Sequence, residues 1–586
     1  MISSLLRKIL PYFTITAAVC LILSLGWREH WISEFLDTTI LFSLVVWLML
    51  LHVGLLFERA EQKGYRAMIC FSLLVLGFPI LEILGWNYWY NSKGDVLESL
   101  TEHKTVLTIG LILYILIRTT RLMRVLYTRI DNPAFIFVTS FIFLALGGTG
   151  LLLLPEVTVQ GISFIDALFT STSAVCVTGL VVLDTAKDFT FLGKVIIMIL
   201  MELGGLGILT ITSFFGYFFR GGASFREGLY MSNFLSSDSL NNVMSLAVKV
   251  VGVTLAIECV GAVMIYYSIQ ETEIGENGPF FFAAFHSVSA FCNAGFSTFS
   301  EGGLYAPKLR NNYTLHLIIA CLLILGGIGF NILFNFYTYI KLTLKKYFYR
   351  VFKKEYLRYP ARIVTLNTHI VVITTIILLF IGTIFYYIVE YDNSLAEHRS
   401  LSGKWIAAFF SSATPRTAGF QVIDVRLLSP ATIFFTMLLM WIGASSASTG
   451  GGIKTSAFAL ALLNIFALSK GKNYLEIRGK QISSTSIRRA FAIITLSLLV
   501  IGFSILMILT FDPEENMLKV SFEAFSAFST VGLSLGITAN LTSGSKVVLI
   551  VLMLLGRIGT FNLMVGMMKK IRTQYHRYPK ESILIN

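Results

Sequence analysis

The sequence predicts an all-α integral membrane protein built mainly from four similar helix–loop–helix repeats. Three observations predict this class. Of 586 residues, 55% are hydrophobic and only 13% are charged, a composition typical of polytopic membrane proteins. The apolar residues gather into runs of about 20, the length that a helix needs to cross a bilayer. A short motif that ends in glycine also recurs four times along the chain.

Residues 1–130 form a region that precedes the repeats. Its four apolar segments predict about four extra N-terminal transmembrane helices, to which the sequence assigns no role. They lie near 11–27, 38–57, 67–86 and 105–123. The last segment ends in Arg118, Arg121 and Arg124, and arginines spaced by three also occur in voltage sensors. A basic cytoplasmic flank explains them as well, and we favour the flank.

Four stretches of the chain share one pattern around a glycine. Each has Phe ten residues before the glycine, Ser or Ala at eight and six residues before it, and Leu or Phe directly after it. These glycines are Gly179, Gly295, Gly419 and Gly532. Their spacing is too long for a solenoid repeat of about 20–50 residues. It matches two spanning helices with a re-entrant loop between them.

The glycine motifs divide the rest of the chain into four domains, each with one apolar helix before its motif and one after it. The domains are 131–241, 242–362, 363–487 with a glycine-rich interruption, and 488–586 with a basic tail. The expected helix pairs are 132–154 and 191–218, 243–268 and 313–340, 363–390 and 430–468, and 489–511 and 545–568.

The residues before each glycine suit a pore loop. A short Ser-rich helix enters a membrane only where it is buried in protein or lines water. Glycine then permits a backbone form in which carbonyl oxygens replace a cation's hydration shell. We therefore predict helix–pore loop–helix repeats around one central pore, although one such loop alone is better explained as a packing face. The predicted filter residues are Val177, Thr178, Gly179, Asn293, Ala294, Gly295, Thr417, Ala418, Gly419, Thr530, Val531 and Gly532.

A glycine-rich stretch, 443–454, interrupts the second helix of repeat three. Consecutive glycines cost about 1 kcal/mol each in a helix relative to Ala, and irregular backbone at membrane depth must line a cavity. A structural kink is the alternative explanation. A phosphate-binding loop is excluded, because Ile453 stands where glycine must precede Lys454 and no strand leads in.

Several charged side chains lie within the apolar runs. An unpaired charge at mid-span costs at least about 2.5 kcal/mol, so Arg557 is expected to face the water-filled path or a carboxylate. Glu202 occupies a corresponding place in repeat one and is the candidate partner. Arg416 is expected to brace the third loop, and Glu258 and His286 to have structural roles.

Three motifs, 174–180, 414–420 and 444–454, resemble those of the Trk/Ktr/HKT superfamily of potassium transporters, and the likeness extends over roughly 130–575. The chain looks most like the prokaryotic Ktr/Trk membrane subunit. Glycine at all four filter positions is similar to the potassium-selective pattern, whereas serine at the first accompanies sodium transport. The resemblance also implies an intramembrane gate below the filter, with Arg557 as a cationic barrier. Its gate residues are Ser448, Thr449, Gly450, Gly451, Gly452, Lys454 and Arg557.

The resemblance implies potassium uptake across the cytoplasmic membrane by a channel-like transporter, with K⁺ as the transported ion and no cofactor in this chain. It further implies a homodimer with one pore per subunit and a separate cytosolic nucleotide-binding regulatory ring. The basic segment 341–362 and the tail are candidate docking surfaces or sites for anionic lipid.

The net charge of +13 does not indicate a nucleic-acid partner, because the basic clusters lie between apolar runs. By the positive-inside rule, they predict that both termini are cytoplasmic. The scattered cysteines give no case for disulfides or zinc. The sequence contains no catalytic constellation, which argues against an enzyme. Two alternatives remain: a secondary transporter of another solute, with broken helices in matched halves, and a voltage-gated cation channel that uses residues 1–130 as its sensor.

Overall fold

The computed structural model describes residues 133–207, 243–270, 272, 278–300, 303–349, 364–398, 400–446 and 448–559. The expected N-terminal helices of 1–130, with Arg118, Arg121 and Arg124, lie outside the described residues, as do most of the basic segment 341–362 and the C-terminal tail. The described part is helical apart from one short hairpin, in which β1 (Glu476–Ile477) pairs antiparallel with β2 (Lys480–Gln481).

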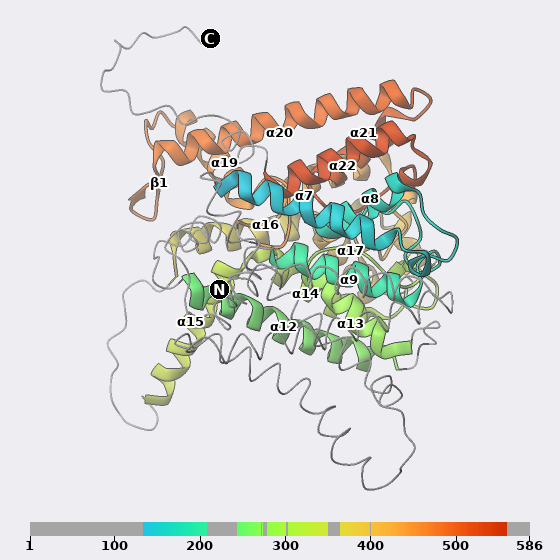
Figure 1. Ribbon diagram of the computed structural model, residues 1–586. Helices are drawn as coiled ribbons and strands as arrows, with labels where there is room; N and C mark the ends of the chain where they lie inside the picture. Colours follow the sequence, from blue (N-terminus) through green and yellow to red (C-terminus); the bar gives the residue numbers. More distant parts are fainter. Residues whose placement is uncertain are drawn as a thin grey trace, which may run out of the picture.

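The helices follow one order four times: a first helix, a short helix that ends just before the glycine motif, and a second helix (Figure 1). Group one contains α7 (Pro133–Leu152), α8 (Phe164–Val175) and α9 (Phe191–Leu206). Group two contains α12 (Val243–Ser268), α13 (Gly278–Phe291) and α14 (Tyr313–Ile328), followed by α15 (Phe330–Phe348). Group three contains α16 (Leu366–Val389), α17 (Leu401–Ala413) and α18 (Pro430–Trp441), followed by α19 (Thr455–Ser469). Group four contains α20 (Ser484–Phe511), α21 (Met517–Phe528) and α22 (Ser543–Ile558).

Short 3₁₀ turns lie in the connections between these helices. They are η1 (Pro155–Val157), η3 (Gly303–Tyr305), η5 (Ser394–Glu397), η6 (Val425–Leu427) and η7 (Thr538–Asn540). Three of the described helices are long and apolar enough to cross a membrane: residues Val248–Ser268 of α12, α16 and α20. The bent pair α14 and α15 makes a fourth if it counts as one span.

The four short helices α8, α13, α17 and α21 are mostly buried among the others. Three of them begin at a polar N-cap, whose side chain satisfies a backbone N–H that has no partner within the helix. Ser163 accepts from Asp166, Ser400 from Gly403 and Asn516 from Leu518. Burial of these short, Ser-containing helices agrees with the rule that such segments enter a membrane only inside protein.

The groups close on themselves, because group four returns to group one (Figure 1). Lys546, in the first turn of α22, forms an ion pair of 2.8 Å with Asp166, in the first turn of α8. The pair joins the first group to the last.

The second helix of each group is shorter than the sequence predicted. The predicted helices 191–218, 313–340 and 545–568 end or break at Leu206, Ile328 and Ile558, and 430–468 breaks after Trp441. In three groups the next residue is a glycine with a left-handed φ of 75–95°, namely Gly207, Gly329 and Gly559. A left-handed residue ends an α-helix, and at Gly329 the axes of α14 and α15 differ by 102°.

Candidate functional site

The four motif glycines form a closed ring. Each motif glycine lies against the loop that follows it in the chain, and the glycine of loop four lies against loop one. A side chain added to the glycine would collide with a backbone carbonyl oxygen of that neighbouring loop. The colliding pairs are Gly179 with Ala294, Gly295 with Ala418, Gly419 with Val531, and Gly532 with Thr178. The loops therefore follow one another around the ring in chain order, and loops two and four lie on opposite sides.

The backbone of all four loops has the same unusual conformation. The residue two positions before each glycine has a left-handed φ of 50–77°, and the glycine itself has a φ of 70–90°. These non-glycine residues are Val177, Asn293, Thr417 and Thr530. Such residues are uncommon and cost roughly 1–3 kcal/mol each, so surrounding structure must hold them. Alternating the hand of the backbone turns successive carbonyl groups toward the same side of a chain.

Hydroxyl groups of the short helices hold the loops in this form. Ser173 Oγ donates to the carbonyl of Leu180 at 2.7 Å, and Ser289 Oγ donates to that of Phe296 at 2.8 Å. In loop four, the Gly532 N–H donates to Ser526 Oγ at 3.1 Å. Each of these serines lies six residues before its glycine, at a position that the sequence pattern had marked.

Loop three is shifted by one residue relative to the sequence pattern. Counting back six residues from Gly419 reaches Ala413, but Thr414 makes the bond, donating to the carbonyl of Phe420 at 2.6 Å. Pro415 follows directly, and a residue before proline is disfavoured in helical conformation. Helix α17 accordingly ends at Ala413, six residues before its glycine, whereas the other three short helices end four residues before theirs.

The segment 442–454 between α18 and α19 packs against this ring. Gly450 lies against the Thr417 side chain and Gly451 against that of Thr530, with no space for a Cβ atom at either glycine. Thr449 Oγ1 donates to the carbonyl of Phe291, at the end of α13, at 3.3 Å. This segment, hereafter the crossing loop, thus contacts loops two, three and four.

The crossing loop is also held from within. Lys454 Nζ donates to the Gly450 carbonyl at 2.7 Å, and Ser448 Oγ donates to the Ser445 carbonyl at 2.7 Å. The Ser445 N–H donates to the Gly327 carbonyl in the last turn of α14 at 3.0 Å. The predicted gate residues 448–454 are therefore gathered directly beside the predicted filter residues.

Arg557, in the last turn of α22, contacts backbone carbonyls from two other groups. Its guanidinium donates to the carbonyl of Thr449 in the crossing loop and, at 2.5 Å, to that of Gly204 near the end of α9. The expected partner Glu202 is wrong: its Oε2 lies 3.4 Å from the Sγ of Cys292. Carbonyls at a helix C-terminus carry partial negative charge, which suits them to receive a cation.

The remaining predicted residues occupy structural positions. Buried Arg416 donates to Thr375 Oγ1 at 3.3 Å and to Thr455 Oγ1 at 3.4 Å, so it braces loop three through two helices rather than through loop backbone. Glu258 is buried, with Oε1 3.7 Å from Cys292 Sγ. Sequence reasoning missed the helix breaks at Gly207, Gly329 and Gly559. The signal was a repeated Gly-x-x-Gly at 204–207, 326–329 and 556–559.

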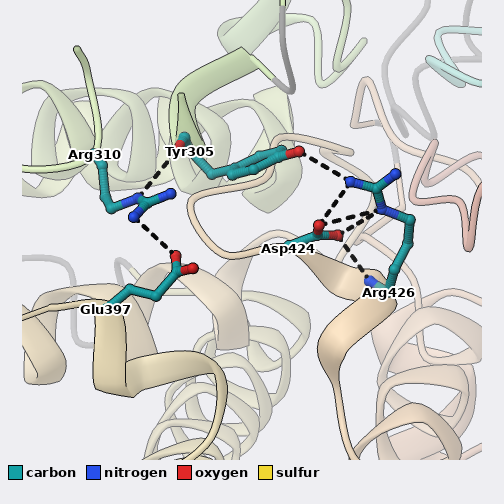
Figure 2. Close-up of polar contacts among 5 residues, drawn as sticks. All are labelled: Tyr305, Arg310, Glu397, Asp424 and Arg426. Atoms are coloured by element: carbon teal, nitrogen blue, oxygen red, sulfur yellow. Dashed lines mark hydrogen bonds and ion pairs between the residues drawn. The ribbon is translucent and has the colours of Figure 1, made fainter. Parts of the chain in front are cut away.

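Outside the ring, two ion pairs clamp the segment before α14 (Figure 2). Arg310 donates to the Tyr305 carbonyl at 3.2 Å and pairs with Glu397 at 3.2 Å. Arg426 donates to the Tyr305 hydroxyl at 3.2 Å and pairs with Asp424 at 2.7 Å. Burial raises the pKa of the Asp424 carboxyl, but the Arg426 side chain and N–H outweigh it and hold that pKa below its usual value. This network links groups two and three.

Comparison with known proteins shows which family contains this chain. The family profile described as TrkH, cation transport protein, matches residues 103–575. The chain belongs to this family. It is 34% identical over 450 residues to the Ktr system potassium uptake protein B of Vibrio alginolyticus, covering 77% of this chain and 94% of that protein. It is also 34% identical to the potassium/sodium uptake protein NtpJ of Enterococcus hirae, covering 78% of this chain and 97% of that protein.

The fold is similar to that of a solved member of the same family. The crystal structure of the potassium transporter TrkH from Vibrio parahaemolyticus superimposes with a TM-score of 0.58, covering 86% of this chain and 97% of that one at 17% identity. The chain is thus a helical membrane protein of the TrkH fold and a cation transport protein of the Ktr/Trk type. Its relatives are named as transporters, not as enzymes.

Proposed function

We propose that this chain takes up potassium across the cytoplasmic membrane as a channel-like transporter. The observation that carries the proposal is the closed ring of four loops that share one left-handed backbone pattern. Four such loops offer a ring of carbonyl oxygens, which can replace the hydration shell of a dehydrated cation. The selectivity filter then consists of 177–179, 293–295, 417–419 and 530–532.

In this proposal the crossing loop is the gate. It lies against Thr417 and Thr530, both at filter positions, so a cation leaving the filter meets it directly. The guanidinium of Arg557 is fixed on the Thr449 carbonyl and adds a positive charge to the same place. Opening requires the crossing loop to leave these contacts.

Sodium is the second candidate ion, because one relative is named a potassium/sodium uptake protein. All four filter positions are glycine here, which favours potassium. A side chain at Gly179 would collide with the Ala294 carbonyl and disturb the ring. Gly179→Ser is therefore expected to weaken the discrimination between potassium and sodium.

The assembly that we propose is a homodimer with one pore in each subunit, both termini being cytoplasmic. A regulatory ring that binds nucleotide in the cytosol is the proposed partner. The name "Ktr system", carried by three relatives, supports a multi-component assembly. The basic segment 341–362 and the tail are the proposed contact surfaces for that partner or for anionic lipid.

The test is cation flux into proteoliposomes that contain the purified chain, measured for potassium, rubidium and sodium beside the Gly179→Ser variant. The proposal expects saturable uptake of potassium and rubidium over sodium, with discrimination reduced in the variant. Equal flux of all three ions that ignores the substitution contradicts the proposal. Adding the cognate regulatory partner distinguishes an inactive chain from one that is held closed.

A further inference from the structure

Two opposite loops of the ring are backed by an ionisable side chain at the same position. His286 on α13 and Glu523 on α21 each lie nine residues before the motif glycine, and both are buried. Loops one and three carry Thr170 and Phe410 at that position. All four loops share one backbone conformation, but only the two opposite loops, two and four, have an ionisable side chain behind them.

Glu523 holds the segment that follows Gly532. Its Oε1 accepts from Ser534 Oγ at 2.6 Å and from the Leu535 N–H at 3.0 Å. Its Oε2 accepts from Thr538 Oγ1 at 2.8 Å. An ionised carboxylate only accepts hydrogen bonds. The Leu535 N–H can only donate, and both hydroxyl groups lie in positions to donate as well, so these contacts suit the charged form.

His286 supports the opposite loop in the same way but without charge. Its Nε2 lies 2.9 Å from Ser297 Oγ, and Ser297 and Ser534 each lie two residues after their glycines. Its Nδ1 lies 2.9 Å from the Phe282 carbonyl, which can only accept. Nδ1 therefore carries a proton. Complete burial disfavours a second proton on the ring, so Nε2 accepts from the serine hydroxyl.

Loops one and three have no brace of this kind in the described part of the chain. Thr170 Oγ1 is buried and has no hydrogen-bond partner there. Behind loop three, the segment after Gly419 borders a small pocket lined by residues that include Ser411 and Gln421. The braces at loops two and four are thus specific to those loops.

The carboxylate of Glu523 has no cationic partner among the described residues, where the ion pairs involve other side chains. A buried charge without a partner is costly unless an opposite charge lies nearby. A cation held in the adjacent ring is such a charge. We propose that Glu523 sets the cation affinity of the ring: it positions the segment 533–538, which follows Gly532, and supplies a negative charge behind the ring when a cation occupies it. This inference rests on the proposed function.

The experiment compares three single variants of the full chain in proteoliposomes. Glu523→Gln removes the charge and keeps a similar shape, Ser534→Ala removes one contact and keeps the charge, and Thr170→Val is the matched control on loop one. The measurement is rubidium uptake against rubidium concentration. We expect the KM to rise roughly tenfold in Glu523→Gln, equivalent to about 1.4 kcal/mol, with Vmax retained. The rise should be smaller in Ser534→Ala and absent in Thr170→Val.

Three other outcomes of this experiment would contradict the inference, wholly or in part. An unchanged KM in Glu523→Gln overturns it while leaving selective uptake by the wild type, and so the proposed function, intact. Equal changes in Glu523→Gln and Ser534→Ala reduce Glu523 to a brace and contradict the role of its charge. A wild type that transports no alkali cation, even with its regulatory partner, removes the proposed function and this inference together.

A second readout does not require transport. A ligand that binds only the folded state stabilises it by RT ln(1 + [L]/Kd), so potassium should raise the melting temperature of the purified wild type by an amount set by its concentration relative to Kd. Glu523→Gln should need roughly tenfold more potassium for the same shift. If that variant does not fold, Glu523→Asp is compared with Ser534→Ala, because Asp keeps the charge but shortens the side chain. An affinity no lower than that of Ser534→Ala supports the role of the charge, and a tenfold loss that Ser534→Ala does not share contradicts it.

Discussion

Arg557 and Thr449 join the last helix of the chain to the crossing loop: the guanidinium donates to the Thr449 backbone carbonyl while it also holds Gly204 on α9. One side chain thereby fixes the crossing loop against group one and group four at once. Because the acceptors are backbone carbonyls, no substitution at the partner residues imitates the loss of this contact. The arginine itself is the position to vary.

Replacing Arg557 should release the crossing loop. Arg557→Gln loses the charge and most of the donors, and charged hydrogen bonds contribute about 1.5–3 kcal/mol each. We expect a lower melting temperature and a several-fold higher basal rubidium flux in proteoliposomes. Arg557→Lys separates charge from shape, because it keeps the charge and cannot span both acceptors. Basal flux at or below the wild-type level in Arg557→Gln contradicts a closing role.

A methyl group in the crossing loop should displace it from the ring. Gly451→Ala places a Cβ atom against the Thr530 side chain, where there is no space. We expect altered flux and a loss of roughly 1–3 kcal/mol of stability, as for an overpacked core. The double variant Gly451→Ala with Thr530→Ala should recover part of both, because it removes the two nearest atoms and leaves the residue-530 Cβ at 3.0 Å. Gly147→Ala on α7 is the control, since nothing lies within 4 Å of that glycine's Cβ position.

The bend after α14 depends on Gly329. Its φ of 95° is strained for any residue with a side chain, so Gly329→Ala should cost roughly 1–3 kcal/mol. The measurement is thermal unfolding of the purified protein. Gly252→Ala on α12 is the control: that glycine has open space around it and should tolerate alanine, which favours helix. Equal melting temperatures for the two variants would show that the bend does not require glycine.

The contact between Asp424 and Arg426 predicts a dependence on pH. The folded state holds the Asp424 pKa below its ordinary value of 3.8, so the pair stabilises the fold above that pH and the stabilisation is lost as pH falls through the folded-state pKa. Asp424→Asn should therefore lower the melting temperature at pH 7 by an amount equivalent to about 0.2–1 kcal/mol, because Arg426 is exposed. The difference from wild type should shrink below pH 3.8. A difference that grows on acidification contradicts the assigned direction.

The sequence predicted the repeated features better than the singular ones. Four glycines with Ser or Ala at fixed spacing before them located all four loops, because a conformation used four times leaves similar residue types at each copy. The interruption at 443–454 was also predicted, because consecutive glycines do not continue a helix. Both inferences rest on what a residue does to its own backbone.

The errors concern partners and boundaries. Glu202 was the candidate carboxylate partner of Arg557, but the guanidinium binds backbone carbonyls instead. Every residue carries such a carbonyl, so no sequence pattern marks these partners. The second helices were predicted without a break, because apolar composition continues past Gly207, whereas the described helix ends there at a glycine with a left-handed φ. Glu523 was not predicted as a functional residue. Its role depends on hydrogen bonds from Ser534, Leu535 and Thr538, which only the fold brings to its carboxylate.

The central claim is that the four loops together hold a dehydrated monovalent cation. Its most direct test is a crystal structure of the purified protein grown with rubidium, with anomalous scattering used to locate the ion. The account predicts an anomalous peak on the axis of the ring, among the carbonyl oxygens that precede Gly179, Gly295, Gly419 and Gly532. Rubidium bound elsewhere in the protein, with no peak at the ring, would contradict it.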